Sequence, residues 1–298
     1  MEVNIFQVDA FTSIPFGGNP AGVVTNAKGL KDSDMQKIAN EMNLSETVFI
    51  RQLDDCYFKM RYFTPLCEVD LCGHATIAAI FTLAKKGYIK PIDSGKKKAL
   101  IETRLGDLEI EIEFKNASPI NITMNQDTPR SIGKLEDIDE LLKIFNINKE
   151  DIGLEKFNAF PEIISTGLPD IILPLKDKGI LDRMEIDHCR LKEYSNKLNV
   201  TGVHAFVVDK NNSQYVYARN FAPAVGIDEE AATGTANGAL IYYLKKNGYI
   251  EENSIRVSQG ESMNRPSIIN CQIEEDGNSY IVKVGGCANI VLEGIIKF

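Results

Sequence analysis

The chain has 298 residues, 44% of them hydrophobic, and its 33 basic and 42 acidic side chains give a net charge of −9. A chain of this size buries one large or two smaller cores and is expected to be globular. Its negative charge opposes polyanions, and no basic run with interleaved aromatics is present, so nucleic acid is not expected as a partner. No segment approaches the ~20 apolar residues of a membrane helix, and no basic residue precedes the first apolar stretch, so we expect no membrane association and a cytoplasmic location.

Strands outnumber helices in the pattern of apolar residues. In the segment Asp107–Phe114 the apolar residues lie on one face and the acids on the other, which is the period of a half-solvated antiparallel strand. The segment Phe58–Tyr62 repeats this signal. Helices are predicted, in chain order, over Asp34–Met42 after the possible caps Asp32 and Ser33, over Lys134–Phe145, and around Asp187–Asn196.

Six cysteines are spread irregularly along the chain, unlike the dense framework of a small secreted domain, so we expect reduced thiols. Cys67, Cys72 and His74 could suggest a metal site. The chain has three histidines and no second cysteine pair to complete a tetrahedral set, so no metal is expected.

An internal duplication is the most informative feature of the sequence. The first copy contains Phe63-Thr-Pro65, an elbow at Cys72-Gly73-His74 and a helical run ending at Gly87-Tyr88-Ile89. The second contains Phe221-Ala-Pro223, an elbow at Thr233-Gly234-Thr235 and a helical run ending at Gly248-Tyr249-Ile250. The strands before them match as well, with Glu46–Ile50 against Val203–Val207. The chain is therefore predicted to be a tandem of two related halves.

Each half is predicted to be a curved antiparallel sheet around one apolar helix. Both helices end at a glycine suited to a left-handed cap, Gly87 and Gly248, and both begin at the elbow. A helix N-terminus offers unpaired backbone N–H groups and a partial positive charge. Two such ends facing one another across a junction of the halves would bind a carboxylate, which makes Gly73 and Gly234 candidate substrate-binding residues.

Glu46 is the candidate acid-base group, because the matching position in the second copy is Val203. A single carboxylate beside a ligand takes a proton from one carbon and returns it to another, provided that its surroundings hold its pKa near the working pH. The alternative is a solvent-facing strand residue. His74 either bonds the helix start or orients substrate and relays a proton. His188 and His204 are interpreted as structural.

Other polar segments allow two interpretations. Glu230 lies in the turn before the second helix, where an acid ordinarily stabilises the helix dipole, and it is the weaker catalytic candidate. The segment Asn19-Pro-Ala-Gly22 and the segment from Ser258 to Ser267 are each consistent with a tight turn. Arg265 could neutralise a substrate acid.

Several of these motifs occur together and in order, and with them the chain resembles the phenazine-biosynthesis PhzF-like family of the diaminopimelate-epimerase-like superfamily. The segments that carry the resemblance over nearly the whole length are Gly18–Val23, Asn43–Phe49, Tyr62–Pro65, Glu68–Thr76, Ala232–Gly234 and Gln259 to Ser267.

The resemblance implies an α+β fold of two pseudo-symmetric, barrel-like halves, with the active site in the cleft between them. The expected division is residues 1–117, to which a C-terminal strand near 287–298 returns, and residues 118–286. The resemblance also implies an isomerase without metal or organic cofactor, and a homodimer.

Residue by residue, Glu46 matches the family's proton-shuttling glutamate, and Gly73, His74 and Gly234 match the residues at the helix starts. Glu230 stands where the family usually has aspartate, and Thr235 where serine is common. These departures affect the shape of the second elbow and which substrate fits. We therefore expect a proton-shift isomerase for a small cyclic or unsaturated carboxylate, with Glu46, His74 and Glu230 as catalytic residues and Gly73, Gly234 and Thr235 as substrate-binding residues.

Three alternatives remain. A racemase or epimerase would use two opposed thiols, but Cys72 is matched by Thr233, whose hydroxyl is too weak an acid, so an elimination using Cys72 alone is the remaining thiol chemistry. Cys72 is otherwise a small buried hydrophobe. A binding paralogue without turnover would keep the site but exchange no carbon-bound proton, and a structural protein would show no effect of a ligand on melting.

Overall fold

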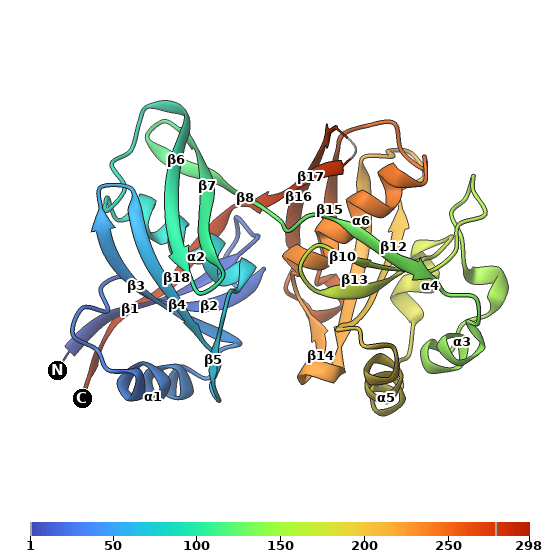
Figure 1. Cartoon of the computed structure of the whole chain (residues 1–298), viewed down its shortest axis with the longest axis horizontal. Coiled ribbons are helices and arrows are strands. Elements are labelled where there is room, and N and C mark those ends of the chain that lie inside the picture. The colour runs from blue at the N-terminus through green and yellow to red at the C-terminus, as the bar shows by residue number, and fades with distance from the viewer. Residues whose placement is uncertain (1, 278) are drawn as a thin grey trace. The chain divides into compact units, whose positions relative to one another are not determined.

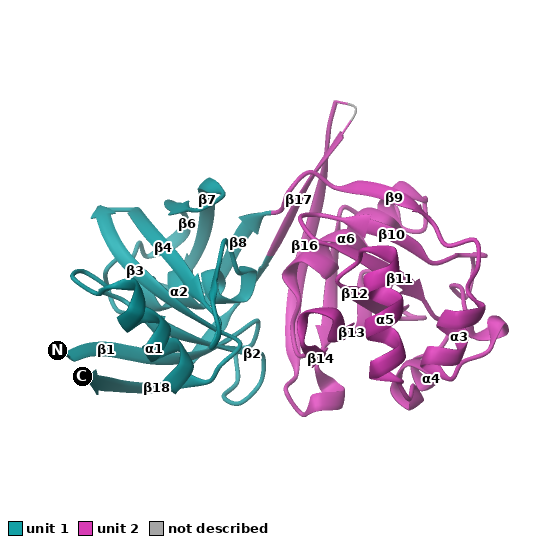
Figure 2. Cartoon of the chain, turned by 60° about the horizontal axis from the view of Figure 1, so that its bottom comes forward, with its two compact units in different colours: residues 1–125, 285–298 teal, residues 126–284 magenta. Residues whose placement is uncertain are grey.

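The computed structural model describes residues 2–277 and 279–298. The chain separates into two compact units, residues 1–125 with 285–298, and residues 126–284, coloured teal and magenta in Figure 2. Among the described residues, no helix has the length and apolar character needed to cross a membrane.

Unit 1 consists mostly of strands and carries two helices among its described residues (Figure 1). Its elements are β1 (Glu2–Ala10), β2 (Asn19–Val24), α1 (Asp32–Met42), β3 (Glu46–Asp54), β4 (Tyr57–Phe63), β5 (Glu68–Val69), α2 (Gly73–Lys85), β6 (Ser94–Thr103), β7 (Gly106–Lys115), β8 (Ser118–Asn125) and β18 (Ala288–Lys297).

The strands of unit 1 surround helix α2. Strand β1 pairs antiparallel with both β2 and β18, β2 runs parallel to β3, and β6, β7 and β8 form an antiparallel meander. Helix α2 packs against β1, β2, β3, β8 and β18, and every residue from His74 to Ala84 is buried. A helix that is apolar on all sides needs such a cover, so the sheet fixes where α2 begins.

Unit 2 also has strands packed around a central helix, and it has more outer helices than unit 1. Its elements are β9 (Arg130–Lys134), α3 (Asp139–Phe145), η1 (Lys149–Asp151), β10 (Glu162–Ser165), β11 (Pro169–Pro174), α4 (Lys178–Arg183), α5 (His188–Leu198), β12 (Gly202–Val208), β13 (Tyr215–Ala222), η2 (Pro223–Val225), β14 (Ile227–Glu230), α6 (Gly234–Lys246), β15 (Ser254–Gln259), η3 (Glu261–Met263), β16 (Ser267–Asp276) and most of β17 (Ser279–Gly286).

Helix α6 is the central helix of unit 2. It packs against β10, β11, β12, β15 and β16. A separate hydrophobic core lies between these strands and the outer helices, and it includes Leu141 and Phe145 of α3, Leu191 of α5 and Phe221 of β13. Because both central helices start and end at matching positions of the duplicated sequence, the duplication appears in the structure as two helices of equal length.

Most predicted elements are present, and several boundaries differ. Helix α1 begins at Asp32, so Asp32 and Ser33 are its first two residues and not its caps. Helix α5 extends to Leu198. Lys134 ends strand β9, and helix α3 begins only at Asp139. Lys134 is held in the sheet because β9 pairs with β10, opposite Glu162. The division of the chain falls after β8 instead of before it, since β8 pairs with β7 and packs on α2. Gly87 and Gly248 have the predicted left-handed backbone, with φ of 81° and 70°.

Replacing Leu83 with alanine should strongly destabilise the protein. The Leu83 side chain is fully buried in α2, so the change leaves a cavity, and the free energy of unfolding should fall by about 2–5 kcal/mol. The matched control is Leu105→Ala in the β6–β7 turn, where the side chain is 69% exposed and the change should stay within about 0.5 kcal/mol. Urea unfolding measures both, and equal effects would contradict the enclosed position of α2.

Candidate active site

The two elbows have the same backbone geometry. The N-cap residues are Cys72 before α2 and Thr233 before α6, both extended, with φ, ψ of −140°, 119° and −124°, 103°. Neither N-cap side chain forms a side-chain capping hydrogen bond to its own helix. A Cβ atom added to Gly73 would meet nothing within 4 Å, so there is open space beside the start of α2.

The same ion pair braces each elbow. Arg61 forms a two-pronged pair with Glu68, with both N···O distances 2.7 Å, and Arg219 forms one with Glu229 at 2.8 and 2.9 Å. Each glutamate lies four residues before its N-cap. Each arginine also lies over a phenylalanine of its own strand, Phe63 at 5.2 Å and Phe221 at 4.9 Å. These matching braces support the internal duplication and tie the segment that leads into each elbow to its strand.

Glu46 and His74 meet in unit 1. Glu46 is the first residue of β3, opposite Ala21 of the parallel strand β2, and His74 is the second residue of α2. Glu46 Oε2 lies 3.2 Å from His74 Nε2. The side chains are 16% and 6% exposed, so the pair is shielded from water. The structure thus brings together two of the three predicted catalytic residues.

Two further side chains complete the surroundings of His74. Asn19 Nδ2 lies 3.3 Å from Nδ1 of the ring. Cys72 Sγ lies 3.4 Å from Nδ1 and 3.9 Å from Nε2. Because the two ring nitrogens point in different directions, a sulfur almost equally close to both lies over the ring, not in line with either nitrogen. The imidazole is therefore held by Asn19, Glu46 and Cys72 together.

Burial and charge act in opposite directions on this group. Burial raises the pKa of Glu46, but the His74 imidazole outweighs it by charge and hydrogen bonding, and the pKa lies below its ordinary value. Burial lowers the pKa of His74, whereas the Cys72 sulfur and the Glu46 carboxylate raise it, and the result lies well above the ordinary value. Burial and the Glu46 charge raise the pKa of Cys72 to about 11. The shifts of Glu46 and His74 both favour the charged forms of these side chains, and Cys72 remains a thiol at neutral pH.

A metal does not fit this arrangement well. Donor atoms of Glu46, Cys72 and His74 all lie within 4.8 Å of one another. A metal on an imidazole nitrogen lies in the ring plane, but the two nitrogens face Asn19 and Glu46 and the sulfur lies over the ring. The imidazole would have to turn before all three residues could share an ion.

The elbow of unit 2 holds Glu230 tightly. Glu230 Oε2 accepts a hydrogen bond from Thr233 Oγ1 at 2.5 Å, and its backbone oxygen accepts one from Gln259 Nε2 at 2.7 Å. Gln259 Oε1 also accepts from Asn237 Nδ2 at 2.8 Å. Thr235 is held through its backbone oxygen, which accepts from Thr166 Oγ1 at 2.8 Å. Glu230 therefore faces the residue that replaces Cys72 in the second copy.

His204 is structural, as expected. It is fully buried, with Nε2 3.2 Å from Asn237 Oδ1 and Nδ1 3.2 Å from Asn220 Nδ2, and burial lowers its pKa to about 4. The duplication matches His204 with Thr47 and Asn220 with Tyr62. A large and a small side chain thus exchange places between the two copies, which keeps the filled volume similar.

Asp170 is a buried acid that the sequence did not single out. It lies in β11 opposite Gly202, is 2% exposed, and its Oδ1 has no hydrogen-bond partner. Burial and the charge of Glu230 raise the pKa of Asp170 to about 7, against a bond from the Gly202 backbone that lowers it. A neutral carboxylic acid therefore persists in unit 2 up to about neutral pH.

The sequence also missed Asn19 and Gln259. Each lies in a Gly-containing segment that is consistent with a turn, and the turn is present in both places, with Gly18 and Gly260 at φ of 61° and 79°. In each segment the sequence also has an amide side chain next to the turn glycine, and this feature could have indicated a buried polar residue. An amide supplies both donors and an acceptor, and a buried one marks a polar network.

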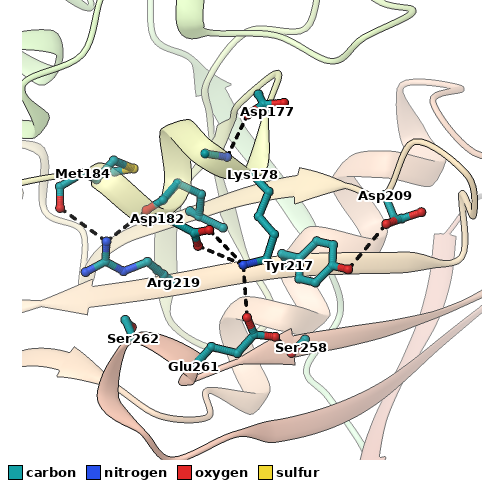
Figure 3. Close-up of polar contacts among 12 residues, drawn as sticks. Asp177, Lys178, Asp182, Met184, Asp209, Tyr217, Arg219, Ser258, Glu261 and Ser262 are labelled. Carbon is teal, nitrogen blue, oxygen red and sulfur yellow. Dashed lines mark hydrogen bonds and ion pairs between the residues drawn. The ribbon is translucent and has the colours of Figure 1, made fainter.

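A cluster of charged residues on unit 2 is a structural network (Figure 3). Lys178 Nζ contacts Asp182 and Glu261 and lies 5.0 Å from the Tyr217 ring centre, while Arg219 donates to the backbone oxygens of Leu181 and Met184. The recess beside them is about 20 Å³, room for about one water molecule. It is too small for a substrate.

Comparison of the fold with solved structures gives the class of protein. The chain matches a hydroxyproline epimerase from Agrobacterium vitis with a TM-score of 0.64 at 10% identity, over 99% of this chain and 91% of that one. It matches a Bacillus anthracis phenazine biosynthesis protein of the PhzF family with a TM-score of 0.88 at 26% identity, over 100% of both chains. This is the diaminopimelate-epimerase-like fold that proline racemases share.

Sequence comparison gives the family. Residues 8–294 match the PhzC-PhzF family of phenazine biosynthesis-like proteins. The chain is 35% identical to an uncharacterized isomerase of Clostridium acetobutylicum, over 97% of this chain and 96% of the relative. It is 31% identical to the trans-2,3-dihydro-3-hydroxyanthranilate isomerase of Pseudomonas chlororaphis, over 90% and 89%. The protein belongs to the PhzF family of isomerases.

The free energy of unfolding of Asp170→Asn, minus that of wild type, should increase as the pH rises. Below pH ~4 the acid is protonated in both the folded and the unfolded state. As the pH rises toward about 7, the unfolded state loses this proton and the folded state keeps it, so wild-type stability falls. Raising the pKa of Asp170 from its ordinary value to about 7 corresponds to about 4 kcal/mol of lost stability once the pH exceeds 7, and asparagine avoids this loss.

The measurement is urea unfolding of both proteins at pH 4, 6 and 8. The stability of the variant minus that of wild type should increase over this series. A difference that stays constant with pH would show that Asp170 ionises as it does in the unfolded chain.

Proposed function

We propose that this isomerase moves a proton between two carbon atoms of a small carboxylated substrate, with Glu46 as the acid-base group and His74 as its partner. The observation that carries the proposal is the shielded contact between Glu46 Oε2 and His74 Nε2 at the start of α2, 3.2 Å long. Glu46 has no counterpart in the second copy of the duplication, where Val203 is fully buried.

The resting state of the pair suits proton removal. Glu46 is a carboxylate at neutral pH because His74 lowers its pKa, so it starts the cycle as a base. Its Oε2 is buried and faces His74 Nε2, and a carboxylate oxygen has a second lone pair that can accept a substrate proton. Once protonated, a carboxyl group beside an imidazolium is a good acid, and it returns the proton to the second carbon. No net proton is gained or lost.

The substrate carboxylate is assigned to a helix start. The N-terminus of α2 offers backbone N–H groups and a positive partial charge, and the space beside Gly73 is open. In unit 2, the start of α6 at Gly234 and Thr235 has the same chemistry, and the nearby carboxylate of Glu230 suits an amino or hydroxyl substituent. The isomerases of trans-2,3-dihydro-3-hydroxyanthranilate among the relatives, at 31% and 30% identity, favour a cyclic unsaturated acid.

Thiol chemistry at Cys72 is the second candidate. Cys72 Sγ lies against the His74 ring, and the racemase fold makes a thiol at this position a natural base. Two features oppose it. Burial and the charge of Glu46 raise the pKa of Cys72 to about 11, so a thiolate is scarce at neutral pH, and the matching residue Thr233 supplies no second thiol.

Glu46→Gln should abolish proton transfer while keeping ligand binding. The amide preserves the shape of the side chain but cannot take up a proton, so the rate should fall at least ~10²-fold. Proton NMR in heavy water follows deuterium entering trans-2,3-dihydro-3-hydroxyanthranilate and a panel of amino and hydroxy acids. The control is Glu41→Gln on the exposed face of α1, with wild-type exchange expected. Near-normal exchange by Glu46→Gln would contradict the assignment.

Cys72→Ala separates the two candidate mechanisms. If Glu46 carries the proton, the variant should retain exchange within about tenfold of wild type, because the thiol contacts Glu46 and His74 but does not itself take up the proton. If the thiol is the base, exchange should fall at least ~10²-fold, as expected for loss of an essential proton-transfer group. The same deuterium assay, with substrate binding measured by calorimetry, gives the answer.

A protein that only binds would give a third pattern. Panel members would raise its melting temperature, but neither wild type nor any variant would introduce deuterium at carbon. That outcome would refute the proposed isomerisation of these acids.

A further inference from the structure

Asn19 is held in place by a tight turn. It is the first residue of β2, is 3% exposed and pairs with Ala10 of β1. The preceding Gly18 has φ of 61°, and a Cβ atom added there would lie 2.1 Å from the backbone oxygen of Ala10. Only glycine fits this turn. The position of the Asn19 amide is therefore determined by backbone and not by a flexible loop.

The imidazole of His74 is enclosed on several sides. Nδ1 faces the Asn19 amide at 3.3 Å, Nε2 faces Glu46 at 3.2 Å, and Cys72 Sγ lies over the ring. Glu46 and Cys72 are the titratable groups that shift the pKa of His74.

The other strands packed on α2 bring few charges toward this end of the helix. Strand β8 has no charged residue in its sequence. On β18, Glu293 pairs with Lys86, just past the C-terminal end of α2. On β1, Asp9 accepts a hydrogen bond from the backbone N–H of Phe16.

We propose that Asn19 is a positioning residue that keeps the Nε2–H of His74 directed at Glu46 in both charge states of the imidazole. An amide donates through its nitrogen or, after a half-turn, accepts through its oxygen. With the nitrogen toward Nδ1, as in this structure, the neutral ring carries its proton on Nε2. With the oxygen toward Nδ1, the ring is protonated on both nitrogens and still donates to Glu46. The inference rests on the proposed role of Glu46 and adds a residue to it.

The function of such a residue is to let the pair change charge without turning the ring. When Glu46 takes a proton from substrate, the field on His74 changes, and a ring with one fixed partner would be held in a single charge state. Asparagine serves both states, whereas aspartate only accepts and leucine does neither. Glu46 is charged in only part of the proposed proton-transfer cycle, so His74 needs a partner at position 19 that suits both of its charge states. An amide is such a partner.

His204 provides an internal reference. Its Nδ1 faces the Asn220 amide and its Nε2 faces Asn237 Oδ1, both at 3.2 Å. The arrangement repeats that of His74, except that a neutral amide oxygen stands in place of the Glu46 carboxylate. Burial lowers the pKa of His204 to about 4, so it is a neutral imidazole with its proton on Nε2.

The test is nitrogen NMR of protein labelled with ¹⁵N in its three histidines, over pH 5–9, with His188→Gln and His204→Gln for assignment. In wild type, the Nε2 signal of His74 should stay in the protonated range while Nδ1 titrates. In Asn19→Asp, Nδ1 should stay protonated across the range. In Asn19→Leu, which tests the same point should the aspartate variant not fold, both signals should move to the averaged values of mixed tautomers.

Activity gives a second readout. Both variants should lower kcat by ~10–100-fold, as loss of an outer partner of a functional histidine does, with KM within about threefold of wild type. In Asn19→Asp the part of the pH profile due to His74 should shift to higher pH. Asn220→Asp is the matched control and should alter the ring signals of His204 but not those of His74.

Unchanged His74 ring signals in both folded variants would overturn the inference, even if activity fell. A wild-type protein that exchanges no proton on any acid tested would instead contradict the proposed function. The ring signals would still decide the role of Asn19 in that case.

Discussion

The contact between Glu46 and His74 is the constraint on which the rest of the site depends. A carboxylate with 16% of its side chain exposed would by burial alone hold its proton more tightly, and the imidazole reverses that tendency. The features around the contact serve to place it. Helix α2 is buried on all sides, the Arg61–Glu68 brace fixes the segment before the elbow, and parallel pairing of β3 with β2 brings Glu46 to the helix start.

The two copies of the duplication share their backbone features but differ in several polar side chains. Both copies keep the elbow, the central helix and the Arg–Glu brace, which all act on stability and position. They differ in side chains at the elbow and on the strand before it. Glu46 is replaced by Val203, and Cys72 by Thr233, while Glu230 has Val69 as its counterpart. One copy therefore has a carboxylate next to a buried imidazole, and the other has a carboxylate bonded to a hydroxyl at its elbow.

Much of this could be predicted from the sequence, because the duplication aligns position with position. It predicted both central helices with their glycine caps, the strands β4 and β7, and the candidates Glu46 and His74. The features that were not predicted depend on contacts between residues far apart in the sequence. The start of α3 shifted because β9 pairs with β10 and holds Lys134 in the sheet. Asn19 and Gln259 resembled turn residues because a turn signal says nothing about which buried group an amide will face. Asp170 required knowledge of its burial beside Glu230.

Carbon NMR of the side-chain carboxyl of Glu46, titrated in wild type and in His74→Gln, tests the central claim most directly. Protein labelled with ¹³C at the glutamate carboxyls permits it, and Glu46→Gln identifies the signal. We expect a Glu46 pKa below the ordinary glutamate value in wild type and a higher one in His74→Gln, where the imidazole no longer opposes burial and only the Cys72 hydrogen bond does. The same pKa in both proteins would show that His74 does not control the carboxylate and would contradict the account.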